Sequence, residues 1–413
     1  MSKPVQKHPA PASARIEQQK TIVLLIAGLL LSLALTFLFN REESVRMRAD
    51  LFPLWNASRA FLDSGRSIYD VQNGTDMLAQ FNNTVHLHDG LFFYPATILL
   101  FILPLAALPY DAAHFIWTLC VQWMFYLGTW LLMASVNWPK SVNQRTLVLV
   151  LGIVSIPIWQ HTIWSQFNAI ATFSLGASYW ALRKGRLGMA GALAAGLTFK
   201  PQATLAPLIF LTVWALLDRK RWRLLASLAA ASLGLWLFAE ALQPGWVAEF
   251  LAMIRVYANS PRYPIGSITD LVWNPYQVTT GLLLLSMLAL TLFWRRAEPG
   301  SAAFCAILVY SVAIGWLSLP VLGMIHLVTA PGVVVLLLSA VEEHSRTATR
   351  KALFGILALY AAGIVLFILG LLRQYGLHIE WTELAYKALL PSYLCAIALW
   401  LLFHIQAKGQ RAK

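Results

Sequence analysis

The chain has 413 residues, of which 59% are hydrophobic and only 12% are charged, and its mean hydropathy is +0.64. Apolar runs near the ~20 residues that a bilayer requires recur along it, which excludes an ordinary soluble protein and predicts an all-α, polytopic membrane protein. The net charge of +13 comes from short Lys and Arg clusters between those runs. This pattern favours contact with membrane lipids and predicts no nucleic-acid partner.

The first apolar segment, residues 21–39, follows a polar start. No small-residue cleavage site comes after it, so we predict an uncleaved helix with a cytoplasmic N-terminus. Further apolar segments bring the number of candidates to thirteen. They are residues 94–109, 112–135, 146–158, 167–182, 187–200, 202–218, 222–240, 276–294, 301–318, 321–340, 352–372 and 385–405.

Positive clusters indicate which helix ends face the cytoplasm. They are at residues 183–186, 219–223, 295–296, 346–351 and 408–413. This distribution predicts that both termini are cytoplasmic, so the number of crossings is even, about 12 transmembrane helices. One segment is then re-entrant or interfacial, either 94–109 or 146–158, and the sequence does not choose between them. The long polar segments 40–93 and 241–275 are predicted outside, as parts of one membrane domain over residues 1–413.

Asp50 opens the carboxylate-rich run of the first outer segment. Residues 51–62 alternate apolar and polar side chains like a short helix lying in the membrane interface. Asp50 therefore has two interpretations, as the N-cap of that helix or as a functional carboxylate at the membrane boundary.

The stretch 187–218 has basic clusters at both ends, so it must cross the membrane outward and return. We predict two short helices with a break at Thr-Phe-Lys-Pro-Gln, where Pro201 ends the helical pattern. Lys200 is thereby placed at the outward tip. A lysine there is either functional or a side chain that snorkels from a helix end.

Other polar residues gather at the same predicted face. Gln166 and Asn168 begin the 167–182 helix, Arg262 and Tyr263 belong to the second outer segment, and His326 is predicted two turns inside a helix that enters from outside. Simpler interpretations exist for each. The amides can join helices by hydrogen bonds, the loop residues can be solvated, and the histidine can be satisfied by a neighbouring helix.

The three cysteines, Cys120, Cys305 and Cys395, all fall inside apolar segments. Their number is odd and they share no metal-ligand spacing. We interpret them as packing residues and predict neither a disulfide framework nor a metal site.

Several ordered motifs resemble those of glycosyltransferase family 87 (the DUF2029 group). The stretch DLFPLWNASRAFLDSGRSIYD and the later LFFYPATILLFILPLAALPYDAAHFIW resemble its opening. The segment from SQFNA to FKPQ resembles its Gly-Gln-x-Asn, basic-turn and Lys-Pro elements, and GMIHL stands where the family tends to have Ser-Trp-x-His. Three departures are Ala96 for a proline, Ser165 for a glycine, and Gly323-Met324 for Ser-Trp. The matching residues of the opening are Asp50, Ala57, Ala60, Gly65, Tyr69, Asp70, Phe92, Tyr94, Pro95, Pro104 and Pro109.

The resemblance implies a GT-C-type bundle whose active site opens at the outer face of the bacterial inner membrane, formed by segments 40–93 and 241–275. Members of the family include polyprenyl-phosphate-mannose-dependent α-mannosyltransferases. A polyprenyl-phosphate sugar would be the donor, a hydroxyl of a glycolipid or glycan the acceptor, and no cofactor is expected. The candidate residues are Asp50 as general base; Lys200, Arg262 and His326 for the donor phosphate; and Gln166, Asn168, Tyr94, Tyr263 and Asp70 for substrate binding.

Alternatives remain open at this point. A retaining enzyme would need a second carboxylate, for which Asp63 and Asp70 are available. The chain contains no Asp-x-Asp pair, so a metal-bound nucleotide-sugar donor is not expected. A flippase or transporter of lipid-linked sugars, and a glycan polymerase or ligase, are rival functions. The sequence specifies neither the sugar nor the acceptor.

Overall fold

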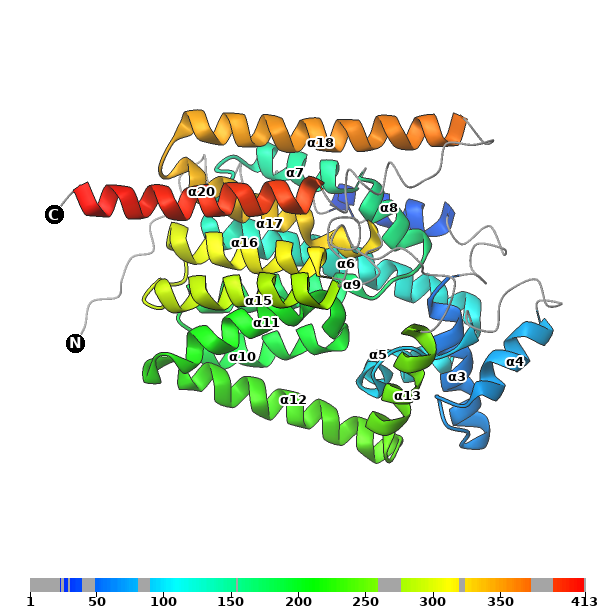
Figure 1. The fold of residues 1–413 in the computed structure, drawn as a ribbon. Helices are drawn as coiled ribbons and strands as arrows, with labels where there is room; N and C mark the ends of the chain where they lie inside the picture. Colours follow the sequence, from blue (N-terminus) through cyan, green and yellow to red (C-terminus); the bar gives the residue numbers. More distant parts are fainter. Residues whose placement is uncertain are drawn as a thin grey trace, which may run out of the picture.

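The computed structural model describes residues 49–80, 90–153, 155–258, 276–318, 324–372 and 389–411, with parts of 23–38. Within these residues the chain is helical and contains no strand (Figure 1). The all-α prediction is therefore confirmed for the described part. Helices suit a bilayer because they satisfy their own backbone hydrogen bonds where water is absent.

The elements follow one another along the chain with short connections. They are α3 (Leu51–Ser64), α4 (Val71–Gln80), η2 (Ala96–Ile98), α5 (Leu99–Ala106), α6 (Tyr110–Val136), α7 (Val142–Ile153), α8 (Ile156–Ile163), α9 (Asn168–Arg183), α10 (Leu187–Ala194), η3 (Ala195–Phe199), α11 (Pro201–Leu216), η4 (Arg219–Arg221), α12 (Trp222–Leu242), α13 (Trp246–Ala258), α15 (Tyr276–Phe293), α16 (Ala302–Leu317), η5 (Met324–Thr329), α17 (Ala330–Glu342), α18 (Arg346–Leu372) and α20 (Leu390–Arg411).

Four helical segments of the described part are long and apolar enough to cross a membrane. They are Tyr110–Val136, Arg219–Leu242, Arg346–Val365 and Leu390–Lys408, and shorter apolar helices accompany them. The chain is thus a multi-pass membrane protein, while the expected number of about 12 crossings is not confirmed. Segment 94–109 forms η2 and the 8-residue α5, and segment 146–158 is divided between α7 and α8. Both are shorter than the ~20 residues that a crossing requires.

The stretch 187–218 has the predicted break. α10 and η3 lead to Lys200, whose backbone has φ −135° and ψ 69°, and α11 begins at Pro201. Proline suits this first helical position because the N–H that it lacks would have no partner inside the helix. The interruption fixes Lys200 between two apolar helices rather than within one.

The expectation for His326 is wrong. The apolar segment 321–340 is not one α-helix, since His326 lies in the 3₁₀ element η5 and α17 begins only at Ala330. Pro331 stands in the first turn of α17, a position where proline favours a helix start. His326 therefore precedes the helix and does not lie two turns inside it.

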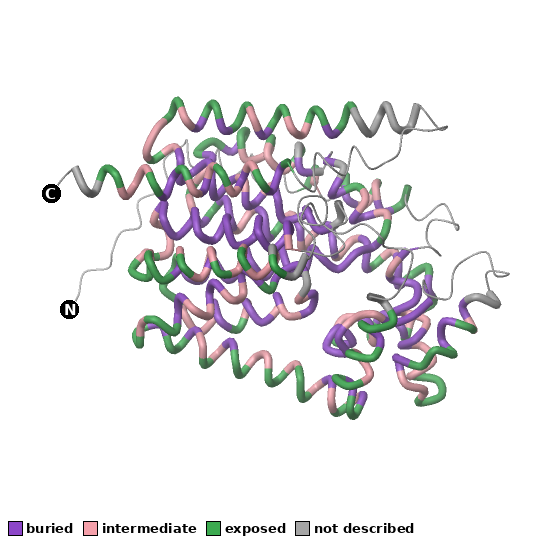
Figure 2. The backbone as a smooth tube through the Cα atoms, in the orientation of Figure 1, coloured by how far each residue is buried: buried purple, intermediate pink, exposed green. Residues whose placement is uncertain are grey.

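The core is formed by helices from the middle of the chain. Every residue of α16 is buried, and Figure 2 shows this central layer between less buried outer helices. A Cβ atom added to Gly128 of α6 or to Gly176 of α9 would overlap the backbone of the other helix, so these helices touch through glycine, as membrane helices often do. α12 and α18 instead expose apolar side chains such as Leu233 and Phe354.

Basic clusters from distant parts of the chain meet at one end of the bundle. Arg183 Nη1 donates to the carbonyl of Pro299 at 2.8 Å, and Arg221 Nη1 donates to that of Arg295 at 2.9 Å. We call this the basic end. Helices α3, α4 and α13 lie at the other end (Figure 1). The clusters therefore share one side of the molecule, as the predicted topology requires.

Candidate functional site

Asp50 is held against the segment that precedes α9. Its N–H donates to the carbonyl of Trp164 at 3.0 Å. Although Asp50 occupies the N-cap position of α3, its side chain makes no capping hydrogen bond. Its Oδ2 instead accepts a hydrogen bond from Nε2 of Gln166. The structure thus disfavours the capping interpretation and directs the carboxylate toward another polar residue.

The side-chain amide of Gln166 connects Asp50 to Lys200. Gln166 Oε1 accepts from Lys200 Nζ at 2.8 Å and lies 3.5 Å from the hydroxyl of Tyr94. Lys200 Nζ also donates to that hydroxyl at 3.2 Å. An amide has one acceptor and one donor end, so its NH₂ faces the carboxylate and its oxygen faces the ammonium group. We call these four residues the Asp50–Lys200 network.

Lys200 is buried, with 5% of its surface exposed. This excludes the snorkelling interpretation, in which the ammonium group would reach water. Burial lowers the pKa of Lys200 to about 8, and the charge of Asp50 acts in the opposite direction. Its ammonium group also lies 5.3 Å from the centre of the Tyr94 ring, within the range of a cation–π contact.

The turn that carries Gln166 depends on Ser165, which has a left-handed backbone with φ 47°. Glycine tolerates this conformation best, and the family resembled here has glycine at the position. Ser165 has compensating contacts. Its Oγ lies 2.9 Å from Nε2 of His114, and its carbonyl accepts from Nε1 of Trp117 at 3.0 Å. These contacts explain how a serine is accommodated beside Gln166.

His161 is a residue that the sequence reasoning missed. It is 2% exposed, and its Nε2 accepts from the backbone N–H of Ala169 at 3.0 Å, in the first turn of α9. An accepting nitrogen carries no proton, so the imidazole is neutral in this arrangement. As an ionisable residue in an apolar stretch, it carried the same signal as His326 and could have been found by it.

Asn168 and His326 belong to a second polar group beside the network. Together with Thr204 and Thr329 they line a small internal cavity between α9, α11, α16 and η5. Asn168 is 1% exposed, and among the described residues neither atom of its amide has a hydrogen-bond partner. An unpaired amide at this depth is costly in free energy, which points to a polar group that enters the cavity.

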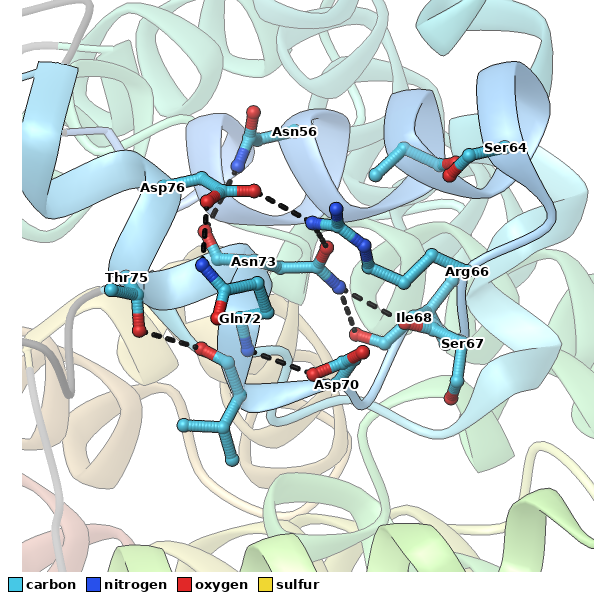
Figure 3. A network of polar contacts seen from close by, with 12 residues as sticks. Asn56, Ser64, Arg66, Ser67, Ile68, Asp70, Gln72, Asn73, Thr75 and Asp76 are labelled. Carbon is cyan, nitrogen blue, oxygen red and sulfur yellow. Dashed lines mark hydrogen bonds and ion pairs between the residues drawn. The ribbon is translucent and has the colours of Figure 1, made fainter.

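The structure does not bring the other candidate carboxylates to Asp50. Asp70 is exposed, and its Oδ1 accepts from the N–H of Gln72 at 2.8 Å at the start of α4, within the polar cluster drawn in Figure 3. Asp63 is exposed on α3 and pairs with Arg59 at 2.9 Å. A role of Asp70 in substrate binding stays a prediction. The candidates Arg262 and Tyr263 lie outside the described residues.

The two predicted outer segments are joined by side chains that the sequence did not single out. Ser67 Oγ donates to Glu249 Oε2 at 3.0 Å, and Gln243 Nε2 lies within 2.9 Å of both residues. We call this the Ser67–Glu249 link. Tyr69 extends it by donating its hydroxyl to the carbonyl of Tyr94 at 2.8 Å. Burial and the charge of Glu249 raise the pKa of Tyr69, so its hydroxyl stays a donor.

The arrangement can serve acid–base and phosphate chemistry. A carboxylate and an ammonium group face opposite ends of one amide at the end of the bundle away from the basic clusters. No group of three His, Cys, Asp or Glu side chains in the part of the chain that the structure describes is suited to hold a metal ion.

Comparison with known families agrees with the sequence motifs. The family model described as glycosyltransferase family 87 matches residues 92–320. This range includes Tyr94, Gln166 and Lys200 and begins after Asp50. No curated protein and no solved structure matches the chain.

Proposed function

The chain belongs to glycosyltransferase family 87, and on that premise we propose that it transfers a sugar from a polyprenyl-phosphate donor to a hydroxyl of a glycolipid or glycan. Family membership makes it a membrane glycosyltransferase, which requires a sugar donor and an acceptor. The proposal adds the lipid-phosphate donor, the periplasmic face of the inner membrane, and inversion at the anomeric carbon with Asp50 as the base.

One observation carries the proposal, namely that Gln166 joins the Asp50 carboxylate to the Lys200 ammonium group. Glycosyl transfer to a hydroxyl needs a base for the acceptor and positive charge for the departing phosphate. These two requirements are met by residues held in a single network. Because both are buried or half-buried, their charges act on a substrate with less screening than on an exposed surface.

The reaction follows from these positions. Asp50 removes the proton of the acceptor hydroxyl as its oxygen forms a bond to the anomeric carbon. The bond between that carbon and the phosphate oxygen breaks on the opposite side, and the electron pair leaves with the polyprenyl phosphate. Lys200 receives the charge that develops on the phosphate. Asp50 then releases its proton to water.

Gln166 and Tyr94 act in this scheme mainly by positioning. Gln166 orients the carboxylate through its NH₂ group and the ammonium group through its oxygen. Tyr94 holds Lys200 from a second direction. Asn168 and His326 are proposed to contact the sugar or its phosphate at the neighbouring cavity, with Arg262, Tyr263 and Asp70 as further contacts from the outer segments.

A transfer assay tests the proposal directly. The purified chain in detergent is incubated with radiolabelled polyprenyl-phosphate mannose and a membrane lipid extract, and in parallel with the glucose and arabinose donors. The expected result is a labelled glycolipid or glycan that Asp50→Asn abolishes and Asp63→Asn does not. Movement of the donor across a vesicle without a new glycosidic bond would instead identify a flippase. Transfer of preassembled oligosaccharides alone would identify a polymerase or ligase.

A further inference from the structure

The basic end of the bundle contains a hollow of about 820 Å³ that the proposed transfer reaction does not use. The turn between α15 and α16, the end of α17 and the last turns of α20 line it, far from α3 and α13 (Figure 1). Arg295, Arg296, His344 and Ser301 are among its lining residues. We propose that this hollow binds the phosphate headgroup of an anionic phospholipid.

The turn that carries the two arginines is fixed from inside the protein. Its carbonyls accept hydrogen bonds of 2.9, 2.9 and 2.8 Å, at Arg295, Ala297 and Pro299, from Arg221, Trp214 and Arg183 respectively. These bonds use the backbone of the turn and not the side chains of Arg295 and Arg296. Neither of those guanidinium groups forms a hydrogen bond or ion pair with any described residue. The hollow is therefore preformed, and its two arginines are available to a ligand.

The charges around the hollow favour an anion. Glu298 and Glu343 also line it, but Glu298 is paired with the buried Arg221 at 3.2 Å. Glu343 is then opposed by both arginines. The first turn of α16 adds positive potential, because the N-terminal end of a helix carries a partial positive charge. A phosphate is a suitable ligand since arginine binds two of its oxygens at once.

The surroundings distinguish a lipid from a soluble phosphate. Val278, Leu282, Leu285 and Leu292 are exposed at the spacing of one helical face of α15. Phe293, which is 64% exposed, continues this stripe to the hollow and is part of its lining. A phospholipid can place its chains along α15 and its phosphate between the arginines. Basic pockets between helices on the cytoplasmic side of a membrane bind lipid headgroups in this way.

Binding of short-chain lipids to the purified full-length chain tests the proposal. Dihexanoyl phosphatidylglycerol is titrated in a neutral detergent, and binding is followed by the shift of thermal unfolding and by native mass spectrometry. Dihexanoyl phosphatidylcholine and inorganic phosphate are the comparison ligands. The double variant Arg295→Gln/Arg296→Gln removes both guanidinium groups. Arg350→Gln/Lys351→Gln, two exposed residues of α18 outside the hollow, removes the same charge elsewhere at this end.

We expect phosphatidylglycerol to bind saturably, and the Arg295/Arg296 variant to bind it roughly thirty-fold more weakly, about fivefold for each basic group. The Arg350/Lys351 variant and Arg295→Lys/Arg296→Lys should retain most of the affinity. If the first double variant does not fold, Arg296→Gln alone should lose about fivefold. Equal losses in both double variants, or equal binding of phosphatidylcholine, would overturn the proposal. So would binding of inorganic phosphate as tight as that of the lipid.

Discussion

The NH₂ group of Gln166 donates to the carboxylate of Asp50 while its oxygen accepts from Lys200. The proposed base and the proposed phosphate ligand are therefore oriented by one side chain, although 150 residues separate them in the sequence. A change at Gln166 must affect both. This coupling makes the network testable one residue at a time.

Asp50→Asn should lower turnover by ~10²-fold or more, because a lost general base costs roughly 10² to 10⁴. An asparagine keeps the size of the side chain and still offers an oxygen to Gln166. The matched control is Asp63→Asn, the same change at an exposed carboxylate of α3. Initial rates with saturating donor and acceptor measure the effect. Near-normal turnover in Asp50→Asn would remove the residue from the mechanism.

Gln166→Glu should move the acidic limb of the pH profile for kcat/KM to higher pH. The new carboxylate keeps the contact with Lys200, but it places a second negative charge beside Asp50 and so raises the pKa of the pair. Activity lost at neutral pH should then recover as the pH increases. Gln72→Glu, an exposed position of α4, serves as the control. A profile that only falls in height, with no shift, would indicate a structural role for Gln166.

Lys200 predicts a pH dependence of donor use. Its pKa is lowered to about 8 by burial, so the ammonium charge is present below that pH and is lost as the pH rises through it. The kcat/KM for the donor should therefore decline above about pH 8, since this quantity reports the free enzyme. Lys200→Arg, whose charge persists far above that pH, should remove the decline. A decline that survives in the arginine variant belongs to another group.

Ser165 separates backbone strain from hydrogen bonding. Ser165→Gly and Ser165→Ala both lose the contact with His114, but only alanine keeps the cost of a left-handed backbone. That cost is roughly 1–2 kcal/mol. The glycine variant should therefore be the more stable of the two, which ranked thermal unfolding in detergent can measure. The opposite order would show that the turn changes conformation.

The sequence predicted those features that depend on local constraints. Basic clusters at both ends of 187–218, with Pro201 between them, were enough to predict the break at Lys200. The placement of His326 failed because hydropathy does not distinguish a 3₁₀ segment from an α-helix. Only the position of Pro331 indicated where α17 begins.

The candidate site was predicted as a set of residues but not as an arrangement. Motif resemblance brought Asp50, Gln166 and Lys200 together, and no spacing could show that one amide joins the other two. The roles of His161 and Ser165 depend on how the turn before α9 folds back, with His161 bonding to Ala169. Long-range packing determines such contacts, and it leaves no local pattern.

The Ser67–Glu249 link joins positions 182 residues apart, and this matters for protein engineering. A chimera that replaces residues 49–80 with those of a relative removes Ser67 and leaves Gln243 and Glu249 with the wrong partner. Replacing α13 and Gln243 at the same time keeps the three side chains matched. The two segments should therefore be exchanged as one cassette.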